Sequence, residues 1–159
     1  MRKSIAAVAL IRRELAGQVQ WLAQWNQRWR CYYFVGGHKR PEESFRECVI
    51  REIDEELHLE PRVDFLLGSE PVARLEFDAF SENTFTDTHY IIELFEVVLT
   101  SVEACRKVES SPENRWLSDD EICRGRTGDD RPISGTMKRL LEAIDGMDRS
   151  REPSGSRIT

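Results

Sequence analysis

The sequence shows no excess of basic residues, no closely spaced cysteine pair and no long apolar run. Its 159 residues include 23 Lys and Arg and 29 Asp and Glu, for a formal net charge of −6. Broad affinity for nucleic acid needs a basic face, so nucleic acid is not an expected partner. The four cysteines never occur as CxxC, which argues against a zinc site and a disulfide framework and favours a reducing cytoplasm.

The chain is predicted to form one domain over residues 1–147, followed by a polar tail over residues 148–159 that is rich in Arg, Ser and Pro. A hydrophobic content of 40% suits a single core, and no internal repeat is present. Near the start, Arg12 and Arg13 interrupt the apolar run that begins at Ile5. This segment is therefore interpreted as a strand rather than as a signal peptide, and no membrane association is expected.

Alternating and β-branched segments predict strands over residues 4–12, 18–25, 30–35, 63–67, 71–80 and 88–100. Helices are predicted over residues 44–57 and 119–123 and around the repeat of Met137, Leu140, Leu141 and Ile144, with Gly146 as its C-cap. The two earlier helices each start with a Ser followed three residues later by a Glu, the pattern of a capping box. Strands before and after one buried helix, with a second helix near the end, predict an α/β/α sandwich around a mixed β-sheet.

Residues 37–59 are the most informative stretch. In a helix that advances about 100° per residue, four apolar side chains form one stripe: Phe45, Cys48, Val49 and Ile53. Glu52 and Glu56 point in the direction of that stripe. A helix that turns two carboxylates toward its apolar side must either desolvate unpaired charge or hold a cation there.

Three carboxylates follow one another closely along this helix. Glu52, Glu55 and Glu56 stand at i, i+3 and i+4, so their like charges repel one another unless a cation joins them. Hard carboxylate oxygens suit Mg²⁺ or Mn²⁺, which complete their coordination with waters and with phosphate oxygens of a substrate. The pattern therefore predicts a site for a metal ion and a phosphate.

Residues 37–59 resemble the Nudix box, the signature of hydrolases that cleave nucleoside diphosphates linked to another moiety. The positions that carry the resemblance are Gly37, Glu43, the Arg51–Glu52 pair and the Glu55–Glu56 pair. One position departs from the pattern, because His58 stands where the family usually has a Gly that supplies a left-handed C-cap. The resemblance implies the same α/β/α sandwich.

The resemblance also implies a metal-dependent hydrolase that cleaves a phosphoanhydride bond. Its substrate would be a small nucleoside diphosphate derivative, such as a nucleoside triphosphate, a nucleotide sugar like ADP-ribose, or a dinucleotide. The implied principal ligands of Mg²⁺ or Mn²⁺ are Glu52 and Glu56. Glu55 is implied as a further or water-mediated ligand, and the carbonyl of Gly37 would complete the set. Glu43 and Arg51 are implied to pair and to brace the loop against the helix.

The general base is left open. Glu52 could act through its free oxygen, or a Glu from a later loop, Glu109 or Glu113, could take the role. Substrate contacts are expected from Gly36 and Gly37, whose backbone can approach phosphate closely, from the cations of Arg28, Lys39 and Arg40, and from Trp25, which can stack a base.

Two alternative functions from other classes of protein remain open in addition to the hydrolase. The first is a non-catalytic sensor of a nucleotide derivative with the same fold. The second is an isomerase of isoprenoid diphosphates, which resembles this fold but normally has a degraded box and uses a Cys and a Glu. The intact acids of this chain disfavour both. The oligomeric state is left open, with a homodimer as one option.

Overall fold

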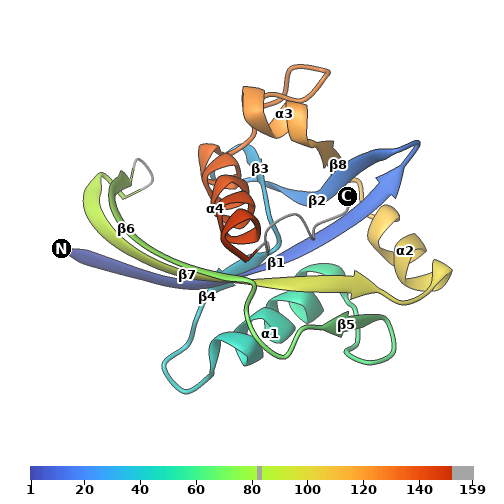
Figure 1. The fold of residues 1–159 in the computed structure, drawn as a ribbon, viewed down its shortest axis with the longest axis horizontal. Coiled ribbons are helices and arrows are strands. Elements are labelled where there is room, and N and C mark those ends of the chain that lie inside the picture. The colour runs from blue at the N-terminus through green and yellow to red at the C-terminus, as the bar shows by residue number, and fades with distance from the viewer. Residues whose placement is uncertain (82–83, 152–159) are drawn as a thin grey trace.

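A twisted mixed sheet lies between two helical layers (Figure 1). The structure, a computed structural model, describes residues 1–81 and 84–151, with residues 146–151 described by their backbone alone. In these residues the strands are β1 (Arg2–Leu15), β2 (Gln18–Asn26), β3 (Cys31–Tyr33), β4 (Gly36–His38), β5 (Phe65–Leu67), β6 (Ala73–Ser81), β7 (Thr86–Leu99) and β8 (Asn114–Ser118). The helices are α1 (Phe45–Leu57), α2 (Val102–Glu109), α3 (Asp119–Arg124) and α4 (Gly135–Arg151).

The long strand β1 holds the sheet together because it has three different partners. It pairs in parallel with β7 between Arg2 and Ile11, and antiparallel with β2 from Arg12 to Leu15. On the edge opposite β7, Ala6, Ala7 and Val8 pair antiparallel with the short strand β4. The order along the sheet is β3-β2-β1-β7-β5, with β6 on β7 and β8 on β2. One parallel pair among antiparallel ones makes the sheet mixed, as predicted.

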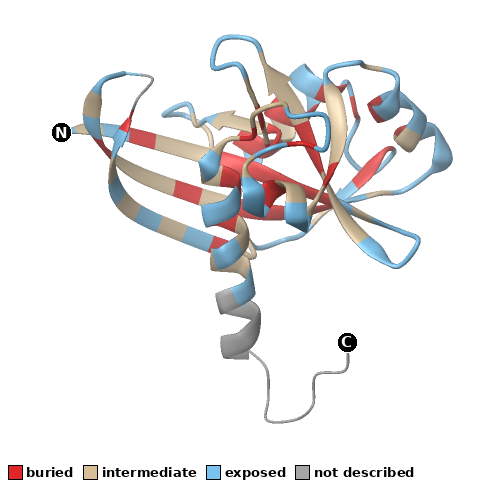
Figure 2. Ribbon diagram, turned by 90° about the horizontal axis from the view of Figure 1, so that it is seen from above, coloured by how far each residue is buried: buried red, intermediate tan, exposed pale blue. Residues whose placement is uncertain are grey.

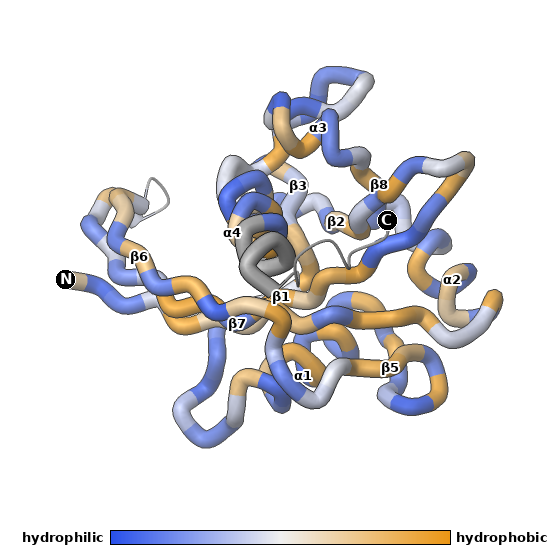
Figure 3. The backbone as a smooth tube through the Cα atoms, in the orientation of Figure 1, coloured by the Kyte–Doolittle hydropathy of each residue, from blue (hydrophilic) through white to orange (hydrophobic). Residues whose placement is uncertain are grey.

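Alternation along β1 divides the core into two layers, because successive side chains of a strand point to opposite faces. Ala7, Ala9 and Ile11 pack in one layer with the apolar stripe of α1. Val8 and Leu10 pack in the other layer with Met137 and Leu140 of α4. Figure 1 shows α1 and α4 on opposite sides of the sheet, and Figures 2 and 3 show buried and apolar residues along its central strands. The predicted α/β/α sandwich is confirmed.

Several elements differ from the sequence-based expectation. The strand predicted over residues 30–35 is shorter and is followed by β4, which was not predicted. Helix α2 and strand β8 were also missed. The predicted C-cap at Gly146 is wrong, because α4 continues through it to Arg151, and a helix tolerates one Gly at a cost of about 1 kcal/mol.

Helix α4 continues past residue 147, and the predicted domain boundary at that residue stays a prediction. Residues 148–151, assigned to the polar tail, continue this helix, and residues 152–159 lie outside the described residues. The described part of the chain contains no helix with the length and apolarity needed to cross a membrane.

Candidate active site

Helix α1 begins with the capping box that the sequence predicts. The Ser44 hydroxyl accepts a hydrogen bond from the Glu47 N–H at 3.0 Å, and the Glu47 carboxylate accepts one from the Ser44 N–H at 2.8 Å. This capping box stabilises the first turn. At the other end, His58 adopts the left-handed conformation with φ 57° and ψ 39°, and its N–H donates to the Asp54 carbonyl at 3.0 Å. His58 therefore takes the backbone conformation for which Gly is usual.

The two glycines of β4 allow two close approaches. A Cβ atom on Gly36 would lie 2.4 Å from the carbonyl oxygen of Ala7 in β1, and one on Gly37 would lie 2.3 Å from Oε1 of Glu52. Both distances are far below van der Waals contact. Gly36 thus lets β4 pair with β1, while Gly37 lets the Glu52 carboxylate lie directly against β4.

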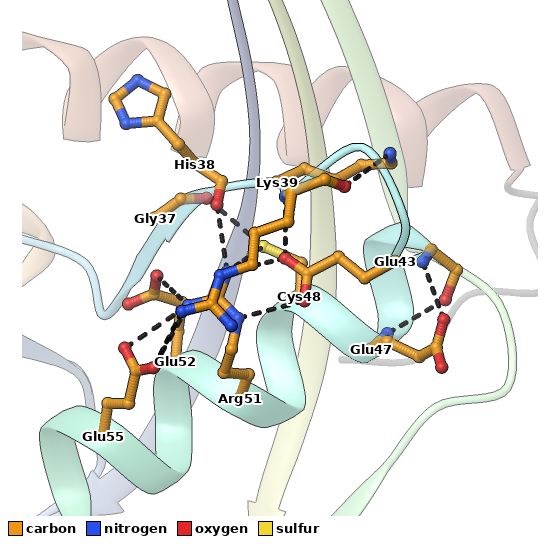
Figure 4. A network of polar contacts seen from close by, with 11 residues as sticks. Gly37, His38, Lys39, Glu43, Glu47, Cys48, Arg51, Glu52 and Glu55 are labelled. Atoms are coloured by element: carbon orange, nitrogen blue, oxygen red, sulfur yellow. Dashed lines mark hydrogen bonds and ion pairs between the residues drawn. The ribbon is translucent and has the colours of Figure 1, made fainter.

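Arg51 joins the loop after β4 to helix α1 (Figure 4). Its Nη2 lies 2.6 Å from Oε1 of Glu43, and its Nε donates to Oε2 of the same carboxylate at 3.0 Å. The same Nη2 also donates to the His38 carbonyl at 3.1 Å. Hydrogen bonds from Arg51 lower the pKa of Glu43 to about 2, and the Glu43 carboxylate in turn raises the pKa of Arg51. The structure thus brings together the two residues implied to form a brace.

The remaining nitrogen of Arg51 gathers two of the predicted metal ligands. Its Nη1 lies 3.0 Å from Glu52 and 3.3 Å from Glu55, and Nη2 of Arg40 lies 3.7 Å from Glu55. The Glu52 side chain is only 11% exposed, whereas that of Glu55 is 46% exposed. Burial raises the pKa of Glu52, and Arg51 opposes this rise by stabilising the carboxylate. The buried carboxylate of Glu52 and the more accessible carboxylate of Glu55 therefore share the guanidinium of Arg51.

Glu56 does not turn inward, so this part of the prediction is wrong. Its side chain is exposed and makes no hydrogen bond or ion pair within residues 1–81 and 84–151. The apolar contacts of the last turn are made instead by Leu57 and by Leu59 just beyond it, which are 3% and 1% exposed. Only the backbone of Glu56 is engaged, through its carbonyl, which accepts a hydrogen bond from Gln24 at 3.3 Å.

Two of the predicted substrate-binding cations, Lys39 and Arg40, lie close to residues of the box. Lys39 lies 5.7 Å from the centre of the Phe45 ring at the start of α1, and Arg40 reaches Glu55 as described above. Arg28 is exposed in the turn after β2, and the structure does not bring it to the box.

Trp25 is also separate from the box residues. Its ring meets the edge of Tyr32 with centroids 5.1 Å apart, and the guanidinium of Arg131 covers it at 4.1 Å from the ring centre. It packs with the core layer on the α4 side of the sheet, not with the layer that contains α1. Arg131, which sequence reasoning missed, therefore already occupies one face of the ring proposed to stack a base.

The two later acids proposed as general base have different surroundings. Glu109 ends α2 and forms an ion pair with Arg13 at 3.2 Å. Glu113 is exposed, and its backbone carbonyl accepts a hydrogen bond from the N–H of Trp25 at 2.8 Å. Its neighbour Asn114 bonds to Gln24, which also contacts the end of α1. Glu113 is thus attached to the strand that reaches the box helix, while Glu109 is held by a cation.

A groove of about 690 Å³ runs along the solvent side of α1. Its lining includes Arg51, Asp54 and His58, together with Asp64 and Lys107. Nζ of Lys107 and Oδ2 of Asp64 form an ion pair at 3.0 Å. Glu52 does not line this groove. The groove is therefore separate from the place where Glu52 meets Gly37, although Arg51 contributes to both.

The carboxylates of Glu52 and Glu55 are suitable ligands for a hard divalent cation, but their positions are not yet those of a formed metal site. Glu52 lies in a cradle that a Cβ atom on Gly37 would fill, and Glu52 and Glu55 both lie within ion-pair distance of one cationic nitrogen. Carboxylate oxygens are the ligands that Mg²⁺ and Mn²⁺ prefer. Within the described ranges, however, no three His, Cys, Asp or Glu side chains already stand together as a metal site. Arg51 occupies the position between the two carboxylates.

Comparison with known proteins agrees with the box and the fold. A family model described as the NUDIX domain matches residues 1–140. No curated protein sequence matches this chain. Among solved structures, the Ap4A hydrolase of C. elegans superposes with a TM-score of 0.60 at 17% identity, covering 92% of this chain and 98% of that one.

Two further similar structures are of NrtR from Shewanella oneidensis. Its NUDIX domain, crystallised with ADP ribose, has a TM-score of 0.60 at 12% identity and covers 95% of this chain and 89% of that one. The longer NrtR chain, complexed with a 27mer DNA, has a TM-score of 0.64 at 14% identity, but the match covers only 63% of that chain against 92% of this one. At such identities these structures show a shared fold alone.

Proposed function

Because this chain belongs to the NUDIX domain family and is a Nudix-type pyrophosphohydrolase, we propose that it hydrolyses a small nucleoside diphosphate derivative with the help of Mg²⁺ or Mn²⁺. The observation that supports this proposal best is the buried Glu52 carboxylate against Gly37, held by Arg51 beside Glu55. A buried carboxylate with a raised pKa and a specific charge partner is a feature of functional sites.

In this proposal Glu52 and Glu55 would be the main metal ligands, because both lie near Nη1 of Arg51. Glu56, implied by the resemblance as a principal ligand, would join them from the exposed last turn together with the Gly37 carbonyl. The bound ion would lower the pKa of the attacking water and offset negative charge on the diphosphate. Arg51, which Glu43 holds from the loop side, keeps Glu52 and Glu55 close to each other. Since Arg51 shares both carboxylates, it would give up part of these contacts when the ion binds.

The residues of this chain also supply the phosphate contacts and the proton acceptor. Lys39 and Arg40, the first two residues of the loop between β4 and α1, would bind phosphate oxygens. The water proton would pass to a carboxylate, and Glu113 is preferred over Glu109 because Arg13 holds Glu109 in an ion pair. Glu52 remains the alternative acceptor. Trp25 and Arg28 lie away from the box, so they would contact only the parts of a substrate that are far from the diphosphate.

The substrate class stays broad in this proposal. The C. elegans protein is named for Ap4A, and the NUDIX domain of NrtR was crystallised with ADP ribose. A dinucleotide and a nucleotide sugar are therefore the first compounds to try, with nucleoside triphosphates beside them. The cysteines without CxxC spacing support a cytoplasmic location, and a homodimer is one of the assembly states to be examined.

A second candidate is a sensor that binds a nucleotide derivative without cleaving it. The similarity to NrtR, which binds DNA in its longer chain, favours this option. The net charge of −6 and the preserved acids of the box weigh against it. Release of phosphate-containing products separates the two candidates, because a sensor would bind ADP-ribose and leave it intact.

The test is a hydrolysis screen of nucleoside triphosphates, ADP-ribose and dinucleoside polyphosphates with Mg²⁺ and with Mn²⁺. Glu52→Gln, Glu55→Gln and Glu56→Gln should each lower kcat by more than the roughly 10- to 100-fold that loss of an outer partner of a metal site costs. Glu60→Gln, an exposed acid just beyond α1, is the matched control and should keep the parental rate. Hydrolysis at the parental rate by all three box variants would reject the carboxylates as ligands.

A further inference from the structure

Two amide side chains connect the end of α1 to the segment that carries Glu109 and Glu113. Nε2 of Gln24 in β2 donates to the Glu56 carbonyl at 3.3 Å and to Oδ1 of Asn114 at 3.1 Å. Nδ2 of Asn114 then donates to the carbonyl of Val108 in α2 at 2.8 Å. The three hydrogen bonds run without interruption from α1 through β2 and β8 to α2.

The carbonyls at both ends of this link are ones that helices leave without an internal partner. The last four carbonyls of an α-helix have no N–H donor within the helix. Glu56 lies in the last turn of α1 and Val108 in the last turn of α2. The two amides therefore satisfy one terminal carbonyl of each helix and fix the two helix ends relative to each other.

The pairing of β2 with β8 places the two amides side by side. Gln24 stands directly opposite Asn114 in this antiparallel pair, so both side chains project from the same face. Leu22, two residues earlier on β2, packs in the core layer that contains Ile53 of α1. The face that carries Gln24 is thus the one turned toward the box helix.

The segment between α2 and β8 is held at other points by contacts that do not involve α1. Glu109 is paired with Arg13 of β1, and the carbonyl of Glu113 accepts the N–H of Trp25. Among the hydrogen bonds of residues 1–81 and 84–151, those of Gln24 join this segment to the turn that carries Glu55 and Glu56.

We propose that Gln24, acting through Asn114, is a positioning residue that sets the separation between the carboxylates of the α1 C-terminal turn and the acid of the 109–113 segment. The inference rests on the proposed hydrolase function and extends it to two residues outside the box. A proton acceptor must lie within hydrogen-bond reach of the attacking water, and a misplacement of about 1 Å can cost about 100-fold in rate. The hydrogen bonds of the Gln24 side chain go to the Glu56 carbonyl and to Asn114, so its proposed effect is on the spacing between the ligands and the acceptor.

The test compares Gln24→Met with Gln20→Met in the full-length chain. Gln20 lies on the same strand and face and is half-buried like Gln24. Its Oε1 accepts one hydrogen bond, from Nε of Arg13 at 2.8 Å, which Gln20→Met removes. With the best substrate and Mg²⁺, Gln24→Met should lower kcat about 10- to 100-fold and leave KM within about threefold, while Gln20→Met should change neither. Gln24→Glu keeps the size and polarity of the side chain but has no donor when ionised, and should reproduce the loss of kcat if the Met variant folds poorly.

Two further readouts separate positioning from a general loss of structure. Hydrogen exchange should become faster at residues 55–59 and 109–114 in Gln24→Met and not in Gln20→Met. In a Glu113→Gln background, Gln24→Met should lower kcat less than about twofold further, because effects of residues that act as a unit are not additive.

Equal kcat and equal exchange in the Gln24→Met and Gln20→Met proteins would overturn the inference while leaving the hydrolase intact. Faster exchange in Gln24→Met with an unchanged kcat would also overturn it, because the link would then be structural only. A parent protein that hydrolyses none of the compounds with either metal would overturn the proposed function, and the inference with it.

Discussion

Gly37 controls where the most buried carboxylate of the site can lie. A Cβ atom at this position would stand 2.3 Å from Oε1 of Glu52 and 2.5 Å from its carboxyl carbon. The atoms it would meet belong to the end of a flexible side chain, not to backbone, so the Glu52 carboxylate can move away and the fold can persist. Gly36 differs, because its Cβ would meet the backbone of Ala7 and Val8.

We therefore expect Gly37→Ala to fold and to lose activity. Displacement of the Glu52 carboxylate by about 1 Å should lower kcat/KM about 100-fold, with a melting temperature close to that of the parent. The measurement is hydrolysis of the best substrate with Mg²⁺, together with a thermal melt. Gly135→Ala is the control, because a Cβ there meets nothing within 4 Å and Ala is favoured in a helix. Parental activity in Gly37→Ala would show that Glu52 does not need its place against β4.

The pairing of Glu43 with Arg51 joins two elements, the loop after β4 and helix α1. Arg51 holds the folded-state pKa of Glu43 at about 2, below its usual value of 4.5. Between these two values the unfolded chain binds a proton that the folded chain does not. The stability that this pair contributes is therefore fully present above about pH 4.5 and is lost as the pH falls toward about 2.

This pH dependence can be measured as a difference between two proteins. The free energy of unfolding of the parent should exceed that of Glu43→Gln at pH 6, and the gap should shrink as the pH is lowered from 5 to 2.5. Urea unfolding at a series of pH values gives both quantities. Glu42→Gln, at an exposed neighbouring position, should show no such change. A gap that stays constant over this range would mean that the ion pair does not shift the titration of Glu43.

The molecule as a whole has two core layers that share one sheet. Leu140 and Met137 of α4 belong to one layer and Ile53 of α1 to the other, and all three side chains are 0% exposed. Strand β1 contributes alternate residues to both layers, so neither layer can lose its packing without disturbing the strand that supports the other.

This shared sheet predicts one cooperative unfolding transition. Leu140→Ala should lower the free energy of unfolding by about 2–5 kcal/mol, the usual cost of a cavity of this kind, and should shift the whole transition. Far-ultraviolet circular dichroism and tryptophan fluorescence should give the same midpoint in urea. Leu66→Ala, at a site that is 57% exposed, should change the stability by less than about 0.5 kcal/mol. Two separate midpoints in Leu140→Ala would show that the layers unfold independently.

The parts that sequence reasoning found depend on contacts between residues close in the chain. The capping box joins Ser44 and Glu47, three positions apart, and the inward direction of Glu52 follows from helical periodicity. The left-handed end at His58 was not predicted, because the sequence has His where the family usually has Gly. The long strands were found because β-branched and alternating patterns are local as well. Helix α2 and strand β8 escaped because their short patterns are stabilised mainly by packing against β2 and the core.

The sequence by itself determined that one helix carries three acids behind a pair of glycines, and that strands surround it, because helix and strand periods are written in neighbouring residues. Only the tertiary structure decided that Glu56 faces solvent and that Arg131 covers Trp25. It also decided that Gln24 meets Asn114, 90 residues away, because that contact depends on the register between β2 and β8. Registers between distant strands are set by the packing of the whole sheet, which no local pattern contains.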